Sequence, residues 1–436
     1  MAIQRRRMLT AALGGAFSAS LLTAGRVDAA PAPVFEKPTA DNPIIACYNE
    51  NPLGLSAAAR KAVADSAAVA NRYPFVRCEV LRKACAQLIG GKPEEIVLSQ
   101  GSAEAIRASV EAHNGPGASL VTAELTYSDG QMAAVRNNIP VIKVKMGLNW
   151  SMDIPAMKAA AAEAAKKGTA IVYFVNPNNP TSTIADTNAL FAWIRGKPAN
   201  TVFILDEAYA EFVEDKSYRS AAELVREGLD NVIVLKTFSK IFAMAGLRLG
   251  FAYAAPERVK KVHDHIAYDF FQNTPAIEAA LAEMNDKAFL KQSLEETLES
   301  RRIMEEVLKE LQLEYLPSQT NFVFFNLKKP LKVFADAMKA ENIMVGRPFP
   351  PATTWCRVSY VRPAEMKYVA DVMRALRTKG VILSEVYERQ TFCRFRDSLI
   401  WSTAEARKHK AASLLSGFSL CFLVFIPSEC HAGHTF

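Results

Sequence analysis

The sequence predicts an α/β protein in which helices cover a mostly parallel sheet and a smaller α+β domain follows. Three near-continuous apolar runs, at residues 171–175, 202–205 and 232–235, are typical of strands that are buried on both faces. Stretches with helical spacing separate these runs. Such alternation of strand and helix is typical of parallel sheets with helices on both sides.

The remaining elements follow from shorter patterns along the chain. A strand is expected at 95–98, followed by Gly101 and a helix at 103–112. Between residues 289 and 311 leucines recur at helical spacing, which predicts an amphipathic helix of about six turns. The second domain is then supplied by two strands and two helices, at 322–327, 356–361, 331–340 and 364–378.

The composition is that of an ordinary globular protein. The chain has 436 residues, of which 50% are hydrophobic and 22% charged, which excludes collagen, disulfide scaffolds, coiled coils and wholesale disorder. The net charge is +7, but residues 1–29 carry +3 and residues 383–436 carry +1, which leaves +3 for the middle. This weak surplus, without a basic stripe, argues against nucleic acid as a partner and favours small-molecule chemistry.

The first 29 residues have the layout of an export signal. Arg5, Arg6 and Arg7 precede a weakly apolar run, and small residues precede the expected cleavage after Ala29. Paired arginines before such a run are typical of twin-arginine signals, which export folded proteins. We therefore expect a periplasmic or otherwise exported protein. An ordinary secretory signal, an uncleaved anchor and a cytoplasmic location are the alternatives.

Residues 383–436 differ in composition from the middle of the chain. They contain three of the seven cysteines, three of the six histidines and an apolar run at 413–427. This run is shorter than the roughly 20 residues of a membrane-spanning helix, so no stable membrane span is predicted. We expect a disordered or dispensable tail, with a membrane-binding or partner-binding role as the alternative.

The spacing of cysteine and histidine gives no sign of a disulfide framework or a metal site. The number of cysteines is odd and no C-x-x-C motif occurs, so core cysteines are expected to act as small hydrophobic residues. His263 and His265 are two residues apart, which on a helix points them to different faces. No H-E-x-x-H motif occurs either, and no metal is predicted.

Polar motifs directly follow the three apolar runs. Residues 176–181 read Asn-Pro-Asn-Asn-Pro-Thr, residues 206–209 read Asp-Glu-Ala-Tyr, and residues 237–240 read Thr-Phe-Ser-Lys. Ligands in open α/β sheets bind outside the carboxyl ends of the strands, so these segments are expected to meet in one crevice. Residues 100–103 lie where a strand turns into a helix, and the free N–H groups there favour a phosphate.

The residue types in these motifs fit the chemistry of pyridoxal 5'-phosphate (PLP). A lysine such as Lys240 can form a Schiff base with an aldehyde and then carry protons. An aspartate such as Asp206 can keep a pyridine nitrogen protonated, which makes the ring an electron sink. Asn, Tyr, hydroxyl and Arg side chains can bind a phenolic oxygen and a phosphate. Taken singly, Asp206 could be a helix cap and Lys240 a surface residue, but four such motifs in this order indicate PLP.

Seven segments resemble those of fold-type I PLP-dependent aminotransferases, and most of all those of the histidinol-phosphate aminotransferase family. The resemblance covers roughly residues 43–380 and is most specific at its last segment. It implies a transaminase of amino-acid metabolism that moves an amino group between an amino acid, or histidinol phosphate, and a 2-oxo acid. The segments are 49–54, 71–74, 101–104, 126–127, 176–181, 206–209 and 237–248.

The resemblance also implies a domain layout. The export signal (1–29) is followed by an N-terminal arm that forms part of the small domain (30–75). A large PLP-binding domain with a sheet of the seven-stranded type (76–274) comes next. A small C-terminal domain (275–382) and the atypical tail (383–436) complete the chain.

Cofactor roles carry over from the family position by position. Lys240 is expected to form the Schiff base and to move the proton, and Asp206 to pair with the pyridine nitrogen. Tyr209 and Asn179 are expected to contact the phenolic oxygen, and Tyr127 to stack on the ring. The cofactor phosphate is assigned to Ser102, Ala103, Thr237, Ser239 and Arg248.

Substrate and subunit contacts carry over in the same way. Arg357 matches the arginine that takes the substrate carboxylate, a task that suits a guanidinium fork. Arg347 and Asn51 are further substrate-binding candidates. Tyr73 in this family reaches the cofactor phosphate of the neighbouring subunit, so a homodimer is expected. Packing roles for Tyr73 and Tyr127, and a solvated Arg347, are the alternatives.

Two departures from the family pattern leave questions open. Ser182 stands where the turn usually ends in glycine, which implies strain if its φ is positive. Ala103 stands where many relatives have aspartate, which removes a side-chain contact but leaves the backbone donor. The substrate is open too, because an export signal does not fit a cytoplasmic histidine pathway. A decarboxylase or lyase resembling threonine-phosphate decarboxylase is the alternative enzyme, and a non-enzymatic PLP-binding protein is the remote alternative.

Overall fold

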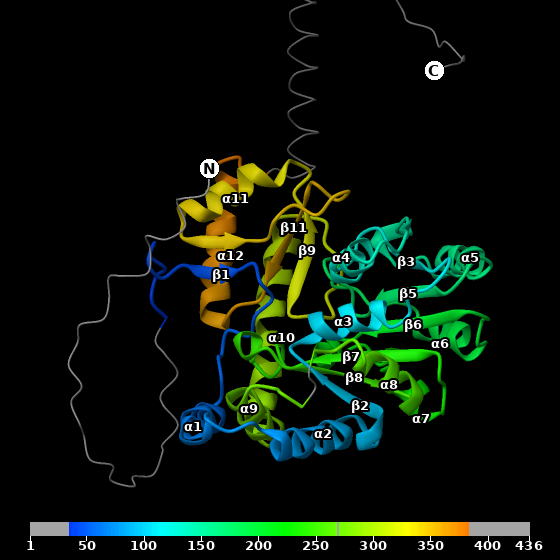
Figure 1. The fold of residues 1–436 in the computed structure, drawn as a ribbon. Helices are drawn as coiled ribbons and strands as arrows, with labels where there is room; N and C mark the ends of the chain where they lie inside the picture. The colour runs from blue at the N-terminus through cyan, green and yellow to red at the C-terminus, as the bar shows by residue number, and fades with distance from the viewer. Residues whose placement is uncertain (1–34, 268–269, 383–436) are drawn as a thin grey trace, which may run out of the picture. The chain divides into compact units, whose positions relative to one another are not determined.

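The computed structural model describes residues 35–267 and 270–382, so the expectations for residues 1–29 and 383–436 lie outside the described residues. The chain divides into a short N-terminal unit, Met1–Lys37, and a unit that begins at Pro38. Every described helix and strand belongs to the second unit, and all contacts discussed below lie within it (Figure 1).

A seven-stranded sheet forms the centre of this unit. Among its strands, β8 runs antiparallel to both of its neighbours and the other six are mutually parallel. The predicted α/β class with a mostly parallel sheet is therefore confirmed. In spatial order the strands are β2 (Ile96–Ser99), β8 (Gly250–Ala254), β7 (Val232–Thr237), β6 (Thr201–Asp206), β5 (Ala170–Val175), β3 (Ser119–Ala123) and β4 (Val141–Val144).

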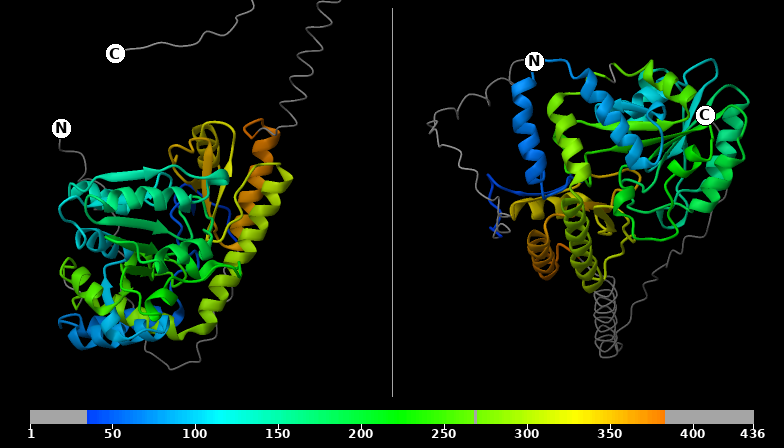
Figure 2. Two further views of the ribbon diagram at one scale, coloured as in Figure 1. Left: turned by 90° about the vertical axis from the view of Figure 1, so that its right-hand side faces the viewer. Right: turned by 90° about the horizontal axis from the view of Figure 1, so that it is seen from below.

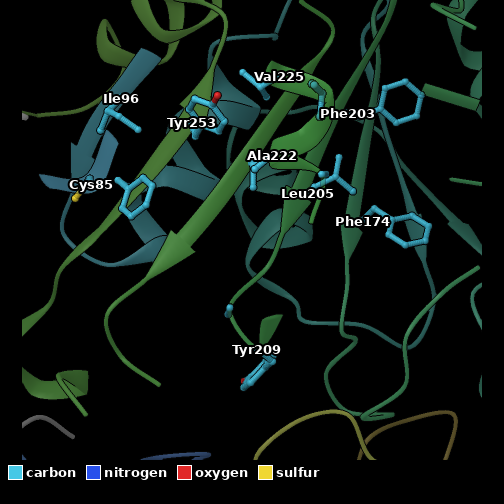
Figure 3. Close-up of a cluster of buried hydrophobic side chains, with 14 of the residues drawn as sticks. Cys85, Ile96, Phe174, Phe203, Leu205, Tyr209, Ala222, Val225 and Tyr253 are labelled. Carbon is cyan, nitrogen blue, oxygen red and sulfur yellow. The ribbon is translucent and has the colours of Figure 1, made fainter. Parts of the chain in front are cut away.

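Both faces of the sheet are buried, which explains the continuous apolar runs. Along β5, Val172 and Phe174 face one buried cluster, whereas Ile171, Tyr173 and Val175 face the other. The first cluster is shown in Figure 3 and is covered by α2 (Phe75–Ile89), α5 (Ile154–Ala165), α6 (Thr187–Arg195) and α7 (Ala222–Arg226). The second is covered by α3 (Ser102–Glu111), α4 (Asp129–Arg136) and α8 (Pro256–His263).

A separate buried cluster organises the smaller α+β part. The parallel pair of β1 (Ile44–Ala46) and β10 (Ile343–Val345) joins segments that are about 300 residues apart in sequence. The antiparallel pair is β9 (Phe322–Asn326) with β11 (Trp355–Ser359). Helices α11 (Leu331–Ala340) and α12 (Pro363–Thr378) pack on these strands. The N-terminal segment and the C-terminal segment therefore share one core.

Helix α10 (Lys287–Glu310) runs alongside both parts (Figure 2). Its C-terminal half buries Met304, Val307 and Leu308 in the small core. Its N-terminal half buries Phe289, Ser293 and Thr297, whereas Leu290 and Leu294 of the predicted leucine stripe are partly buried against the core of the large sheet. Ser293 accepts from Asn51 Nδ2 at 2.6 Å and donates to the Ile241 carbonyl at 3.2 Å, so a polar contact joins this half of the helix to the segment next to Lys240.

Two more helices complete the described architecture. Helix α9 (Thr274–Asn285) packs on α1 (Ala57–Ser66) and α2, and its Ala276 and Ile277 belong to the core of the large sheet. The domain boundary near residue 274 stays a prediction. Short 3-10 turns occupy Ala67–Val69, Pro93–Glu95, Leu148–Trp150, Ala210–Phe212 and Ala245–Leu247.

The described residues contain no membrane-spanning helix, no candidate metal cluster and no disulfide. None of their helices is both long and apolar enough to span a bilayer. In the same part of the chain no group of three or more His, Cys, Asp or Glu side chains could hold a metal ion. The four cysteines within the described ranges are buried free thiols, namely Cys47, Cys78, Cys85 and Cys356.

Candidate active site

The three polar motifs meet in one cavity at the carboxyl edge of the parallel strands. Strands β5, β6 and β7 are adjacent and parallel, so the residues that follow each of them reach the same edge. The cavity has a volume of about 390 Å³. Of the residues predicted for the site, it is lined by Ser102, Ala103, Tyr127, Asn179, Asp206, Tyr209, Thr237, Ser239, Lys240, Arg248 and Arg357.

Among the described residues that line this cavity, Lys240 is the only lysine. Its Nζ donates a hydrogen bond of 3.0 Å to the carbonyl oxygen of Asn49 and lies 5.7 Å from the centre of the Tyr209 ring. Burial, and secondarily the charge of Arg357, lower the pKa of Lys240 to about 8. A substantial fraction of the amine is therefore neutral near physiological pH, as a nucleophile or a proton acceptor requires.

Asp206 ends strand β6 with its carboxylate almost fully buried. One oxygen accepts from the backbone N–H of Ala208 at 3.1 Å, and the other from the hydroxyl of Tyr173 at 3.2 Å. Burial raises the pKa of Asp206 to about 6, and these two hydrogen bonds oppose that rise. The carboxylate is held in one orientation and would be stabilised by a cationic partner.

The Tyr209 hydroxyl lies between two amides. Asn49 Nδ2 donates to it at 3.0 Å and Asn179 Nδ2 at 3.5 Å. Burial raises the pKa of Tyr209 to about 12, so the phenol is protonated and can donate into the cavity. Its ring meets the Phe322 ring edge-on, with centroids 5.1 Å apart.

Arg357 is a buried cation on strand β11. Its Nη1 donates to Asn179 Oδ1 at 2.7 Å and its Nη2 to the Cys47 carbonyl at 2.6 Å, while its buried Nε has no partner. The guanidinium carbon lies 5.0 and 5.4 Å from the ring centres of Phe349 and Phe322. No carboxylate within the described residues makes an ion pair with Arg357, so its charge is available for an anion that enters the cavity.

A set of backbone and side-chain donors forms a cup at the start of helix α3. A Cβ atom added to Gly250 would lie 2.8 Å from the backbone nitrogen of Ser102, and one added to Gly101 would lie 2.5 Å from Arg248 Nη2. Only glycine allows these groups to approach so closely. Ser239 Oγ accepts from Arg248 Nη1 at 3.5 Å and from the Thr237 hydroxyl at 3.0 Å. This cup of N–H, hydroxyl and guanidinium donors suits a phosphate.

Tyr127 lines the cavity, and Ser182 directly follows the Asn-Pro segment at 176–181. Tyr127 is partly exposed where it lines the cavity, and burial together with nearby Asp129 raises the pKa of its phenol. Ser182 is fully buried with φ 63°, so the condition of a positive φ, under which serine is strained at this position, is met.

Three predicted residues do not line the cavity. The Asn51 amide donates to the carbonyl of Ile241 at 3.1 Å and to Ser293 Oγ at 2.6 Å, so it anchors the chain next to Lys240. Arg347 is exposed and stacks on Phe349 at 4.6 Å. Tyr73 is 75% exposed. Substrate or subunit roles for Asn51, Arg347 and Tyr73 stay predictions.

Asn49 is the residue that the sequence analysis did not assign. It has a left-handed backbone, φ 56°, so that its carbonyl oxygen can accept from both Lys240 and Asn321 while its amide bonds Tyr209. Tyr48 and Glu50 beside it also line the cavity. The one available signal was the segment at 49–54, which the resemblance already contained without a role for Asn49.

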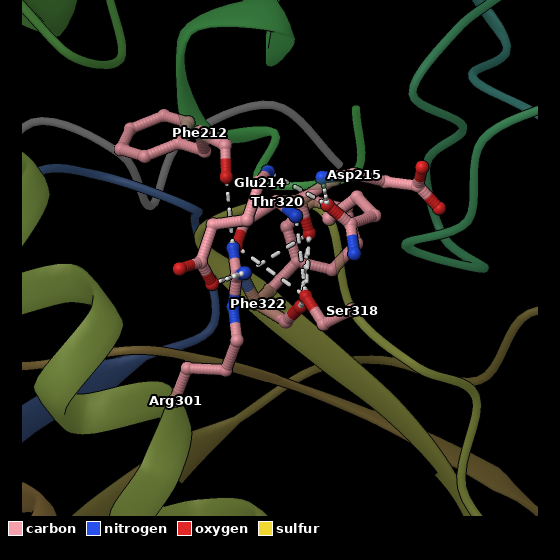
Figure 4. Close-up of polar contacts among 8 residues, drawn as sticks. Phe212, Glu214, Asp215, Arg301, Ser318, Thr320 and Phe322 are labelled. Carbon is pink, nitrogen blue, oxygen red and sulfur yellow. Dashed lines mark hydrogen bonds and ion pairs between the residues drawn. The ribbon is translucent and has the colours of Figure 1, made fainter. Parts of the chain in front are cut away.

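A polar network centred on the buried Arg301 lies beside the segment that follows Tyr209 (Figure 4). Arg301 of helix α10 donates to Glu214 Oε2 at 2.8 Å and to the carbonyls of Phe212 and Thr320 at 3.1 and 3.0 Å. It thereby ties the loop after Tyr209 to the segment that leads into Phe322.

Comparisons with known proteins agree with this geometry. The model of the class I and II aminotransferase family matches residues 43–373. The histidinol-phosphate aminotransferase of Maricaulis maris is 35% identical over 303 residues, which are 69% of this chain and 82% of that protein. A crystal structure from Erwinia carotovora atroseptica, assigned provisionally as a histidinol-phosphate aminotransferase, is 46% identical with a TM-score of 0.78, and covers 80% of this chain and 100% of that one.

A further solved structure bears on the cofactor. The histidinol-phosphate aminotransferase of Sinorhizobium meliloti in complex with pyridoxal-5'-phosphate is 25% identical, with a TM-score of 0.70, and covers 76% of this chain and 91% of that one. The predicted family, transaminase class and cofactor are thus confirmed. The chain belongs to the class I and II aminotransferases, a family that uses pyridoxal 5'-phosphate.

Proposed function

We propose that this chain transfers an amino group between an amino acid, or histidinol phosphate, and a 2-oxo acid, with Lys240 as the attachment site of PLP. The observation that carries the proposal is that three groups with distinct tasks line one cavity: the Lys240 amine, the Asp206 carboxylate and the Arg357 guanidinium. The histidinol-phosphate aminotransferase names of the relatives support the substrate class. They also make decarboxylation the less favoured reaction.

The residues present fit PLP. The cup around Gly250 and Arg248 would hold its phosphate, and Asp206 its pyridine nitrogen. Tyr209 and Asn179 would hold the phenolic oxygen, because both direct hydrogen-bonding groups into this part of the cavity. When bound, PLP supplies a ring that withdraws electrons from the carbon that loses its proton.

The chain's own side chains supply binding, orientation and proton transfer. Lys240, with its pKa of about 8 and its hydrogen bond to the Asn49 carbonyl, can take a proton from the substrate carbon and return it. Arg357 would bind the substrate carboxylate, because its buried Nε has no partner and its charge is uncompensated. Phe322 and Phe349 fix the plane of that guanidinium.

Trapping and half-reaction experiments test the proposal. Purified apoprotein is incubated with PLP, reduced with borohydride and digested, and the labelled peptide should contain Lys240. Single-turnover assays with glutamate, other amino acids and histidinol phosphate should yield the 2-oxo product without CO2.

Lys240→Ala should abolish turnover, whereas Lys261→Ala, which changes an exposed lysine of α8, should not. Full turnover by Lys240→Ala, or label at another lysine, would refute the assignment.

We also propose that the protein acts as a homodimer in which Tyr73 completes the partner's phosphate site. Tyr73 is 75% exposed and stacks on Phe271 at 5.2 Å, so a large aromatic surface faces outward. Mixing inactive Lys240→Ala with a Tyr73→Ala variant tests this. A mixed dimer would contain one intact site, so activity should reappear on mixing. No recovery from two folded, exchanging variants would contradict the shared site.

We further propose export by the twin-arginine route. The support is the Arg5–Arg7 cluster and the weakly apolar run after it. Cell fractionation of the full chain should find it outside the cytoplasm, and changing Arg5 and Arg6 to lysine together should retain it inside. Export that is unaffected by this double change would contradict the twin-arginine route.

A further inference from the structure

Tyr173 is a fully buried titratable residue that the proposed function does not use. It lies on β5 opposite Ile204 of β6, two residues before Val175, which is opposite Asp206. Because side chains alternate along a strand, Tyr173, Val175 and Asp206 share one face of the sheet. The Tyr173 hydroxyl therefore reaches the carboxylate from below the cavity, while Val175 lines the cavity itself.

The ring of Tyr173 is held between the sheet and helix α4. A Cβ atom added to Gly130 would lie 2.5 Å from Tyr173 Cδ1, so the helix backbone rests directly on the ring. The phenol is permanently a donor, because burial and the nearby carboxylates raise its pKa well above the ordinary value. Tyr173 is thus a fixed and protonated donor.

The hydrogen bonds of Asp206 are divided between its two oxygens. Ala208 N–H binds Oδ1 and Tyr173 binds Oδ2, and each oxygen keeps lone-pair capacity for one further donor. Without the Tyr173 hydroxyl, only one oxygen would be fixed and the carboxylate plane could rotate about the Cβ–Cγ bond. Correct orientation of a catalytic carboxylate depends on such supporting hydrogen bonds.

We propose that Tyr173 is a positioning residue, which orients the Asp206 carboxylate toward the pyridine nitrogen of PLP. The proposal rests on the proposed function, since it assumes that Asp206 binds that nitrogen. Tyr173 itself touches neither cofactor nor substrate, because it is buried beneath the cavity and is absent from its lining.

Tyr173→Phe removes the hydroxyl and keeps the ring. A matched control is Tyr253→Phe on β8, because Tyr253 is equally buried but lies in the opposite cluster (Figure 3) and makes no hydrogen bond to the cavity. PLP binding to apoprotein is measured by equilibrium dialysis across pH. We expect Tyr173→Phe to weaken PLP binding about tenfold, since a hydrogen bond to a charged group is lost. Tyr253→Phe should bind PLP as the wild type does.

A second readout needs no cofactor. The Tyr173 hydroxyl lowers the pKa of Asp206, so in Tyr173→Phe the apoprotein's stability should change with pH at a higher midpoint than in the wild type. A third readout uses the PLP-loaded enzyme. In Tyr173→Phe, kcat should fall more than KM rises, because the Asp206 carboxylate acts on the cofactor ring and not on substrate binding. A merely structural role would lower stability at every pH and leave the midpoint in place.

The outcomes separate this inference from the proposed function. Unchanged PLP affinity and an unchanged midpoint in folded Tyr173→Phe would overturn the positioning role, provided that Asp206→Asn still loses the cofactor. If Asp206→Asn binds PLP normally, the proposed function itself fails. If Tyr173→Phe does not fold, Gly130→Ala serves as a second variant, because its added Cβ displaces the Tyr173 ring but keeps its hydroxyl. Gly130→Ala should also weaken PLP binding, and unchanged binding would overturn the inference.

Discussion

Replacing Asp206 by asparagine should stabilise the apoprotein and weaken cofactor binding. Burial raises the pKa of this carboxyl from 3.8 to about 6. A group whose folded pKa is raised takes up more protons in the folded state than in the unfolded state, so stability falls as pH rises between the two pKa values. Above pH 6 the full cost of the buried charge is present. Two pKa units correspond to roughly 3 kcal/mol.

Asparagine keeps the shape of the side chain and removes this cost. At about pH 8.5, where Lys240 is mostly neutral, apo Asp206→Asn should exceed the wild type in free energy of unfolding by about 2 to 3 kcal/mol. The difference should shrink as pH falls and vanish below about pH 3, because the carboxyl is then protonated in both the folded and the unfolded wild type. Urea titrations or thermal melts of apoprotein at several pH values measure this dependence.

Glu207 provides a matched comparison. It is the next residue in the chain and burial raises its pKa too, but Lys236 lies 3.4 Å away and Ser220 and the Ala221 N–H bind its carboxylate. Because these partners offset part of the cost of burial, Glu207→Gln should stabilise the protein less at alkaline pH than Asp206→Asn does. If Asp206→Asn were no more stable than the wild type at alkaline pH, or were equally stabilised at every pH, the reasoning about the buried carboxylate would be wrong.

Three other perturbations test neighbouring parts of the site. The rate at which apoprotein captures PLP should rise with pH, be half-maximal near pH 8 and level off about one unit higher. In a stopped-flow assay Arg357→Ala should move this midpoint upward, because the guanidinium lowers the pKa of Lys240, whereas Arg357→Lys should largely preserve it. Gly250→Ala should weaken PLP binding by about tenfold or more in equilibrium dialysis, because the added Cβ would lie 2.8 Å from a backbone nitrogen of the phosphate cup. The control is Gly246→Ala, whose added Cβ would have no atom within 4 Å and which should bind PLP normally. Ser182→Gly should be about 1 kcal/mol more stable than Ser182→Ala in urea titrations. Both variants lack the hydroxyl, and only alanine keeps a Cβ at φ 63°, so equal stabilities would show that the turn is not strained.

The central strands could be predicted from the sequence because burial on both faces leaves a continuous apolar run. Strands β5, β6 and β7 have this pattern. Strand β4 is less buried and carries the exposed Lys143, and β8 begins with Gly250 and contains two alanines, so neither gives a strong apolar signal. The small residues of β8 have a physical reason, since Gly250 passes directly beside the backbone of Ser102.

The convergence of the site could be predicted in part. Parallel strands end at one edge, which places Asp206 and Lys240 together without any knowledge of their contacts. The support from Asn49 and Tyr173 could not be predicted in the same way. Asn49 meets Lys240 across 191 positions of the chain and through its backbone carbonyl, which no residue pattern encodes. Tyr173 lies inside an apolar run, where its hydroxyl gives no signal of its own.

The charges of the site have a consequence for when the protein should bind PLP. Burial opposes the charged form of Lys240, Asp206 and Arg357 alike, as their shifted pKa values indicate. In the apoprotein these groups are therefore a net source of instability, because each is desolvated more than it is paired. A ligand with a cationic ring nitrogen, a phosphate and an aldehyde complements all parts of the cavity, and it stabilises the fold through binding as well as through relief of this cost. For the proposed twin-arginine export, this predicts that PLP uptake precedes translocation, because that route carries folded proteins.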